Sequence, residues 1–231
     1  MKIKQVHVVW INDTDLEAEL PTKFRSAVDS WSSVHDGLSV KLWRGKEVED
    51  LVRSAYPSFL DLYQKLTTPI QRSDLARLLI LHAHGGVYAD VDVECKKSFL
   101  LNPDFLPKGN ALVKSTVPLL TFQNNVMFAS EPHDDFWLSV AEKIKTNIQQ
   151  VNSTTNNARI LWHTPLLKHL VRILATMQLT GPSVLDQTLA LYPQFRIAMT
   201  LLPEDEYYRG DVLWHGESGH WAPSWISNLQ L

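Results

Sequence analysis

The run from Ser73 to Glu94, SDLARLLILHAHGGVYADVDVE, constrains the fold of this chain more than any other stretch. Its leucines recur at helical spacing, and the pair Gly85-Gly86 then ends the predicted helix. An extended segment from Val87 to Val93 follows, and residues two apart in a strand face the same way. Asp90 and Asp92 therefore present carboxylates on one side, where like charges repel unless a cation or a proton lies between them. The run predicts a cation site.

The acidic segment of Asp90, Asp92 and Glu94 has the ligand chemistry of a hard cation. Mg²⁺, Mn²⁺ and Ca²⁺ prefer carboxylate oxygens, and the segment holds no histidine that would favour zinc. The simpler alternative is a solvated edge strand with acidic side chains. The helix, the glycine pair and Tyr88 that precede the acids favour the metal site.

The overall composition indicates an ordinary globular protein. With 231 residues, 45% hydrophobic and 20% charged, we expect one domain over residues 1–231. The net charge of -3 and the lack of any Lys and Arg cluster argue against a nucleic-acid partner. The single cysteine, Cys95, excludes an internal disulfide and four-thiolate metal sites, and fits a reducing compartment.

The sequence holds no membrane-spanning segment, because no run approaches the roughly 20 apolar residues that a span needs. We therefore expect a cytoplasmic protein. The alternative is the Golgi lumen, if an anchor has been removed from the natural protein. The sequence leaves the oligomeric state open.

Strand patterns alternate with helix patterns in the first half, which predicts a parallel α/β sheet with function at the strand ends. The expected strands are 3–11 and 38–43, and the expected helices are 21–34, 47–55 and 71–84. In the second half we expect strands over 111–114 and 126–129, helices over 134–148, 165–177 and 184–191, and loops over 149–157 and 203–208.

Asp74 and Arg77 lie three residues apart on the helix that precedes the acids. One interpretation is an ordinary intrahelical ion pair, which contributes about 0.2–0.5 kcal/mol. The functional interpretation places this helix beside the acidic strand, where Asp74 holds a substrate hydroxyl and Arg77 meets a phosphate or orients a carboxylate.

Aromatic and amide side chains at strand ends are further candidates. Trp10 closes the first strand and can either stack on a nucleobase or pack in the core. Asn124 and Asn125 can bond sugar hydroxyls, although paired asparagines more often form turns.

The tail from Trp214 to Trp225 combines three tryptophans with two histidines. His215, His220 and Ser224 can supply a further metal ligand, and Trp225 can cover a site, whereas a plain aromatic anchor is the alternative. Other catalytic devices are missing from the sequence: the nucleophile elbow, the phosphate-binding P-loop, and the dinucleotide-binding glycine motif after the first strand.

Five separated segments of the chain resemble the DXD-containing glycosyltransferases of the sugar-binding-region type. This family includes the yeast inositolphosphoceramide mannosyltransferases and is related to the catalytic domains of clostridial glucosylating toxins. The segments are Val8-Val9-Trp10-Ile11, the Ser73–Glu94 run, Asn124-Asn125-Val126-Met127, Thr180-Gly181-Pro182, and His220-Trp221-Ala222-Pro223-Ser224-Trp225.

The resemblance implies a GT-A-type, Rossmann-like fold with a central mixed, mostly parallel sheet. It also implies a metal-dependent enzyme that moves a hexose from GDP-mannose, UDP-glucose or UDP-galactose with retention of configuration. The acceptor would be a hydroxyl on a glycan, a lipid or a protein-linked sugar, and the cofactor Mn²⁺ or Mg²⁺.

The resemblance further implies roles for individual residues. The metal would be held by Asp92 directly and by Asp90, which also meets the ribose, and His220 is our candidate for a further ligand from the tail. Residues at the donor or the reacting sugar would be Asp74, Arg77 and Asn125. Residues at the nucleotide would be Trp10, Ile11 and Tyr88, with Ser224 and Trp225 closing over the diphosphate. The tail departs from the family pattern at Gly219 and Pro223, so His215, His220 and Ser224 all stay open as the tail ligand.

Two other classes fit the same residues. The first is a non-catalytic binder of sugars or sugar nucleotides, and the second is a sugar-nucleotide hydrolase. For a transferase, two mechanisms stay open. The acceptor hydroxyl can attack on the face from which the leaving group departs, or a protein carboxylate can form a covalent intermediate. The sequence does not identify the base, the sugar or the acceptor.

Overall fold

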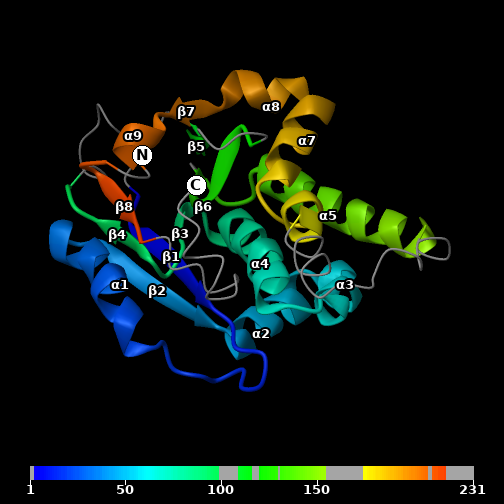
Figure 1. The fold of residues 1–231 in the computed structure, drawn as a ribbon, viewed down its shortest axis with the longest axis horizontal. Helices are drawn as coiled ribbons and strands as arrows, with labels where there is room; N and C mark the ends of the chain where they lie inside the picture. Colours follow the sequence, from blue (N-terminus) through cyan, green and yellow to red (C-terminus); the bar gives the residue numbers. More distant parts are fainter. Residues whose placement is uncertain are drawn as a thin grey trace.

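A computed structural model describes residues 3–98, 109–115, 120–129, 131–154, 174–207 and 210–216. Six strands of this part form one sheet in the order β2-β1-β3-β6-β5-β7 (Figure 1). Their bounds are Gln5–Trp10 for β1, Ser39–Arg44 for β2, Gly86–Ala89 for β3, Ala111–Lys114 for β5, Phe122–Ala129 for β6 and Thr200–Leu202 for β7. A separate ribbon pairs β4, Val93–Cys95, with β8, Leu213–His215.

The six-stranded sheet is mixed, as predicted. Strand β1 runs parallel to both β2 and β3, and β5 runs parallel to β7. Strand β6 is antiparallel to its neighbours β3 and β5. The start of β6 therefore lies beside the end of β3, and this places Asn124 and Asn125 next to the acids.

Helices cover both faces of the sheet. On one face lie α2, Gly45–Ala55, α4, Pro69–His84, α5, Asp135–Thr154, and α7, Ser183–Leu191. On the other lie α1, Thr22–Val34, and the β4–β8 ribbon (Figure 1). The shorter helices are η1, a 3₁₀ helix over Pro57–Phe59, α3, Leu60–Lys65, α8, Pro193–Ala198, and α9, Glu204–Tyr207.

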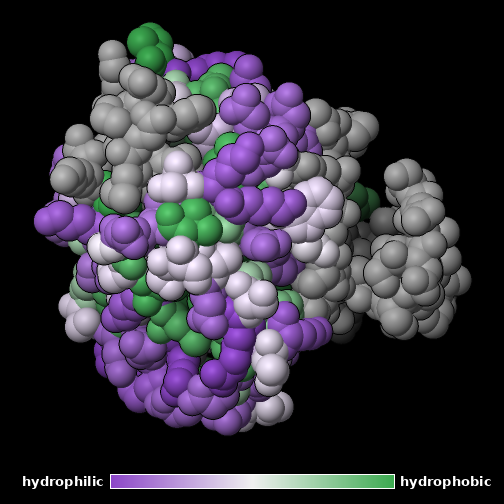
Figure 2. Space-filling model, turned by 90° about the vertical axis from the view of Figure 1, so that its left-hand side faces the viewer, coloured by the Kyte–Doolittle hydropathy of each residue, from purple (hydrophilic) through white to green (hydrophobic). Residues whose placement is uncertain are grey.

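Strands β1, β3, β5 and β6 each contribute side chains to two hydrophobic cores, one on each face of the sheet. Val9 and Tyr88 pack on the side of α4, whereas Val8 and Val87 pack on the side of α1. The face with α1 and the β4–β8 ribbon is turned to the viewer in Figure 2, where hydrophilic residues surround small hydrophobic groups. No described helix is both long and apolar enough to cross a bilayer.

Helix α4 is the central helix of the fold, and local sequence signals fix both of its ends. Thr68 caps the start by accepting a hydrogen bond from the Gln71 amide at 3.2 Å, and Pro69 takes the first position. Gly85 ends the helix with φ 65°. Gly86 has φ 85°, and a Cβ there would lie 2.6 Å from the Gln5 carbonyl oxygen, so neither position suits a larger residue.

The structure corrects the prediction of a single strand that carries both acids. Strand β3 ends at Ala89, and the chain then turns, because the Val93 amide donates to the Asp90 carbonyl oxygen at 3.1 Å. Asp90 and Asp92 therefore flank a turn between β3 and β4.

Two predicted loops were also wrong in part. Helix α5 continues to Thr154, six residues beyond the expected end. The acidic segment expected as a loop contains α9. Strand β6 begins at Phe122, earlier than expected, because its pairing with β5 extends it.

Candidate active site

Three elements bring the predicted site residues together. Helix α4 supplies Asp74 and Arg77, the end of β3 supplies Tyr88 and Asp90, and the start of β6 supplies Asn124 and Asn125. The Asp90 amide donates to the Asn125 carbonyl oxygen at 2.8 Å, which continues the β3–β6 ladder by one residue. This backbone contact holds the first acid against β6.

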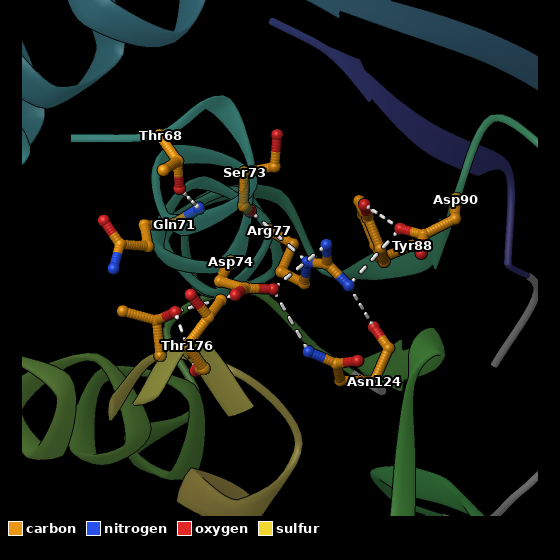
Figure 3. A network of polar contacts seen from close by, with 10 residues as sticks. Thr68, Gln71, Ser73, Asp74, Arg77, Tyr88, Asp90, Asn124 and Thr176 are labelled. Atoms are coloured by element: carbon orange, nitrogen blue, oxygen red, sulfur yellow. Dashed lines mark hydrogen bonds and ion pairs between the residues drawn. The ribbon is translucent and has the colours of Figure 1, made fainter. Parts of the chain in front are cut away.

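Arg77 is at the centre of a buried polar network (Figure 3). Its guanidinium donates through Nη1 to the Asn124 carbonyl oxygen at 2.6 Å and forms ion pairs with Asp74 at 3.2 Å and Asp90 at 3.3 Å. The residue is 5% exposed, and the neighbouring carboxylates raise its pKa against the effect of burial. Arg77 is therefore a permanent buried cation held between two acids.

Asp74 is held by three side chains. Its Oδ1 accepts from Asn124 Nδ2 at 3.2 Å and pairs with Arg77, and its Oδ2 accepts from Thr180 Oγ1 at 2.8 Å. Burial raises the pKa of Asp74 to about 6, against the opposing effect of Arg77, so the carboxyl is mainly ionised at neutral pH. Both carboxylate oxygens are engaged, and the residue is 3% exposed.

Tyr88 connects the buried network to Asp90. Its hydroxyl donates to Asp90 Oδ1, and the Arg77 guanidinium lies over its ring at 4.6 Å. Burial raises the pKa of Tyr88 well above its ordinary value, so the hydroxyl stays a donor. Asp90 Oδ1 thus forms an ion pair with Arg77 and accepts a hydrogen bond from Tyr88. Its Oδ2 has no hydrogen bond among the described residues.

Asp90, Asp92 and His215 form a cluster of three possible metal ligands. Their donor atoms lie within 4.8 Å of one another, and His215 Nε2 is 3.3 Å from Asp92 Oδ1. The β4–β8 ribbon positions the histidine by pairing it with Val93, and the Gly216 amide donates to the Asp92 carbonyl oxygen at 2.8 Å. The two carboxylates suit Mn²⁺ or Mg²⁺. The imidazole is also a zinc ligand, so zinc is disfavoured by the acidic segment alone but not by this cluster.

The other predicted contacts lie around this centre. Trp10 is half-buried, and its ring packs against Phe24 with a centroid distance of 5.7 Å. Ile11 is buried in the core on the α4 side, so only its backbone can face a ligand. The buried Asn125 Oδ1 accepts no hydrogen bond in the part of the chain that the structure describes.

The predicted tail residues Ser224, Trp225 and His220 lie outside the described residues. Of the three open tail ligands, His215 is the one that the structure describes, and it stands beside Asp92. Sequence reasoning assigned no role to Thr180 and missed its bond to Asp74. The Thr180-Gly181-Pro182 segment of the resemblance was the one available signal.

Known proteins resemble this chain in sequence and in fold. Residues 21–115 match the family described as glycosyltransferase sugar-binding region containing DXD motif. This segment is therefore similar to the sugar-binding region of DXD-containing glycosyltransferases. The matched segment includes four residues of the candidate site: Asp74, Arg77, Asp90 and Asp92.

The chain is also similar to curated proteins of two yeasts. It is 30% identical to inositol phosphoceramide mannosyltransferase 3 of Schizosaccharomyces pombe, over 61% of this chain and 36% of that protein. It is 28% identical to mannosyl phosphorylinositol ceramide synthase CSH1 of Saccharomyces cerevisiae, over 58% of this chain and 34% of that protein. The chain therefore spans little more than a third of these relatives.

Among solved structures, the PaToxG glycosyltransferase superposes with a TM-score of 0.55 at 16% identity. The match covers 84% of this chain and 75% of that one, and it shows a shared fold. The GT-A-type fold expected from the resemblance is confirmed.

Proposed function

We propose that this chain is a divalent-cation-dependent retaining glycosyltransferase. It moves a hexose from a nucleoside-diphosphate sugar to an acceptor hydroxyl. The observation that carries this proposal is the position of Asp90, which shares one oxygen with Arg77 and Tyr88 and belongs to the ligand cluster with Asp92 and His215. A buried guanidinium and a candidate metal-ligand cluster thus meet at one carboxylate, and their positive charges favour an anionic ligand such as a diphosphate.

The residues of the chain have separate tasks in this proposal. Asp90, Asp92 and His215 would hold the cation, which supplies neutralisation of the charge on the departing diphosphate. Arg77 fixes Asp90 and adds positive potential next to the cluster. Asn125 Oδ1, a buried acceptor, favours a hydroxyl of the bound sugar as its donor.

The surroundings of Asp74 favour attack from the leaving-group face over a covalent intermediate. A nucleophilic carboxylate needs a free oxygen at the anomeric carbon, whereas both Asp74 oxygens accept bonds from neighbours. Asp74 therefore serves best as the residue that positions Arg77. The contact between Asp74 and a donor hydroxyl that the resemblance implies stays a prediction.

The names of the relatives guide the choice of substrates. Both yeast proteins are named for mannosyl transfer to an inositol phosphoceramide, so we propose GDP-mannose as the first donor to test and a glycolipid as the first acceptor. UDP-glucose and UDP-galactose follow. The single domain over residues 1–231, the cytoplasmic location, and the roles of His220, Ser224 and Trp225 stay predictions.

A product analysis tests the proposal. The full chain is incubated with each donor, Mn²⁺, and inositol phosphoceramide or oligosaccharide acceptors, and the first-formed glycoside is followed by NMR. We expect a glycoside with the anomeric configuration of the donor. An inverted product would contradict the retaining mechanism, and nucleoside diphosphate released at the same rate with or without every acceptor would favour the hydrolase.

A further inference from the structure

A surface hollow of about 370 Å³ lies between α1 and the β4–β8 ribbon. Figure 1 shows α1 and the β4–β8 ribbon, the elements that contribute most of its lining. Its walls combine two aromatic rings, two carboxylates, an ammonium group and a glycine: Phe24, Trp214, Asp92, Glu94, Lys23 and Gly216.

Trp214 is the unusual residue of this hollow. It is 43% exposed, although tryptophan is among the side chains that gain most from burial. The Lys96 ammonium lies over its ring at 4.4 Å and restrains the ring. The β4–β8 register places Glu94 directly opposite Trp214 on the neighbouring strand. A flat apolar surface therefore stands beside a carboxylate that can accept hydrogen bonds.

The position of the hollow relates it to the candidate metal cluster. Asp92 lines the hollow, and it also belongs to the cluster with Asp90 and His215. The buried network of Asp74 and Arg77 belongs to α4, on the opposite face of the sheet. A molecule in the hollow would thus approach the cluster from the side away from this network.

We propose that the hollow binds a pyranose unit of the acceptor, which stacks on Trp214 and bonds Glu94 through its hydroxyls. A pyranose has an apolar face of C–H groups and a rim of hydroxyls. The Trp214 ring matches the apolar face, and the carboxylates and the ammonium group of the hollow match the hydroxyls. The identification of this sugar as part of the acceptor rests on the proposed transferase function. The binding of a sugar at this place is a separate claim.

The test is ligand-detected NMR on the full chain without metal or donor. The probes are the methyl pyranosides of α-mannose, β-glucose and β-galactose, and saturation transfer gives their dissociation constants. We expect at least one probe to bind. Trp214→Ala should weaken its binding about tenfold or more, and Trp214→Tyr, which keeps a flat ring, should restore most of it.

Tyr192→Ala is the matched control, because Tyr192 is a 42% exposed aromatic residue at the end of α7, away from the hollow. It should leave the binding of the probe unchanged. Glu94→Ala is a second variant that does not depend on how Trp214→Ala folds, and we expect it to weaken binding as well.

Two results would overturn the proposal. One is that no pyranoside binds, or that the probe binds Trp214→Ala and Glu94→Ala as well as it binds the unaltered chain. The other is displacement of the probe by UDP or GDP, because the hollow would then hold the leaving group of the donor. Sugar binding without any nucleotide-sugar turnover would refute the transferase proposal and leave the sugar site standing.

Discussion

Arg77 Nη1 lies 3.3 Å from Asp90 Oδ1, so a guanidinium buried within α4 is tied directly to the first acid after β3. The same guanidinium reaches Asp74 one turn earlier on its helix and the backbone of Asn124 on β6. One planar cation thus joins three elements of the fold at the point where the candidate metal ligands begin.

Replacement of Arg77 by lysine tests whether the planar shape of the guanidinium is needed. Arg77→Lys keeps the charge, but a single ammonium cannot satisfy Asp74, Asp90 and the Asn124 carbonyl together. We expect the free energy of unfolding to fall by about 2 kcal/mol or more, measured by urea denaturation. Arg53→Lys is the control, since its exposed pair with Glu49 contributes at most about 0.5 kcal/mol. Equal stability of the two variants would contradict the network.

The bond from Thr180 to Asp74 gives a second stability prediction. Thr180→Val keeps the shape of the side chain and removes the donor to a buried carboxylate, which should cost about 1–3 kcal/mol. Thr146→Val is the control, because its exposed hydroxyl only bonds the Glu142 carbonyl oxygen of its own helix. Urea denaturation of both variants checks the prediction, and a Thr180 variant as stable as the control would refute it.

How far the sequence could predict this site depends on the range of each signal. The spacing of Asp74, Arg77, Asp90 and Asp92 within one run indicated a shared site, because a helix and a strand joined by two glycines are adjacent in space. The same local pattern led to the wrong strand through the acids. Nothing local shows that the chain turns after Ala89 to begin a second ribbon.

Long-range partners account for what the sequence missed. His215 approaches Asp92 because β8 pairs with β4, two strands of three residues each with little periodic signal. Thr180 reaches Asp74 from a turn before α7. Such contacts arise from tertiary packing, so they follow from the fold and not from residue spacing.

His215 should contribute to metal affinity. We expect His215→Asn to weaken Mn²⁺ binding about 10-fold to 100-fold by calorimetry, because one of three ligands is lost. His133→Asn is the matched control, since His133 is exposed and has φ 62°, a backbone conformation that asparagine tolerates. Unchanged Mn²⁺ affinity in the His215 variant would remove this residue from the proposed ligand set.

Stability should fall in acid because of His7. Its Nδ1 accepts from Trp43 Nε1 at 3.1 Å, so Nε2 carries the proton and donates to the Gly85 carbonyl oxygen, also at 3.1 Å. Burial, with a smaller effect of His84, lowers the pKa of His7 to about 4. A histidine with a lowered pKa in the folded state stabilises the protein fully above its usual pKa of 6.5, and this contribution disappears as the pH falls towards 4.

The loss assigned to His7 is roughly 3 kcal/mol, from the difference between the two pKa values. Urea unfolding at pH 7 and pH 4 measures the total change. The lowered pKa values of His35, His82 and His84 add to the effect of His7, whereas the raised pKa of Asp74 opposes it. His7→Gln should flatten this dependence. An equal pH dependence in the variant would show that His7 titrates normally.

The most direct test of the account is the release of nucleoside diphosphate from GDP-mannose, UDP-glucose and UDP-galactose by the full chain. With Mn²⁺ we expect slow release from one donor. EDTA should abolish this release, and Asp92→Asn should lower it about 100-fold or more, whereas Asp36→Asn, a change at an exposed turn, should leave it intact. Release that persists unchanged with EDTA or in Asp92→Asn would contradict a metal-dependent site at Asp90, Asp92 and His215.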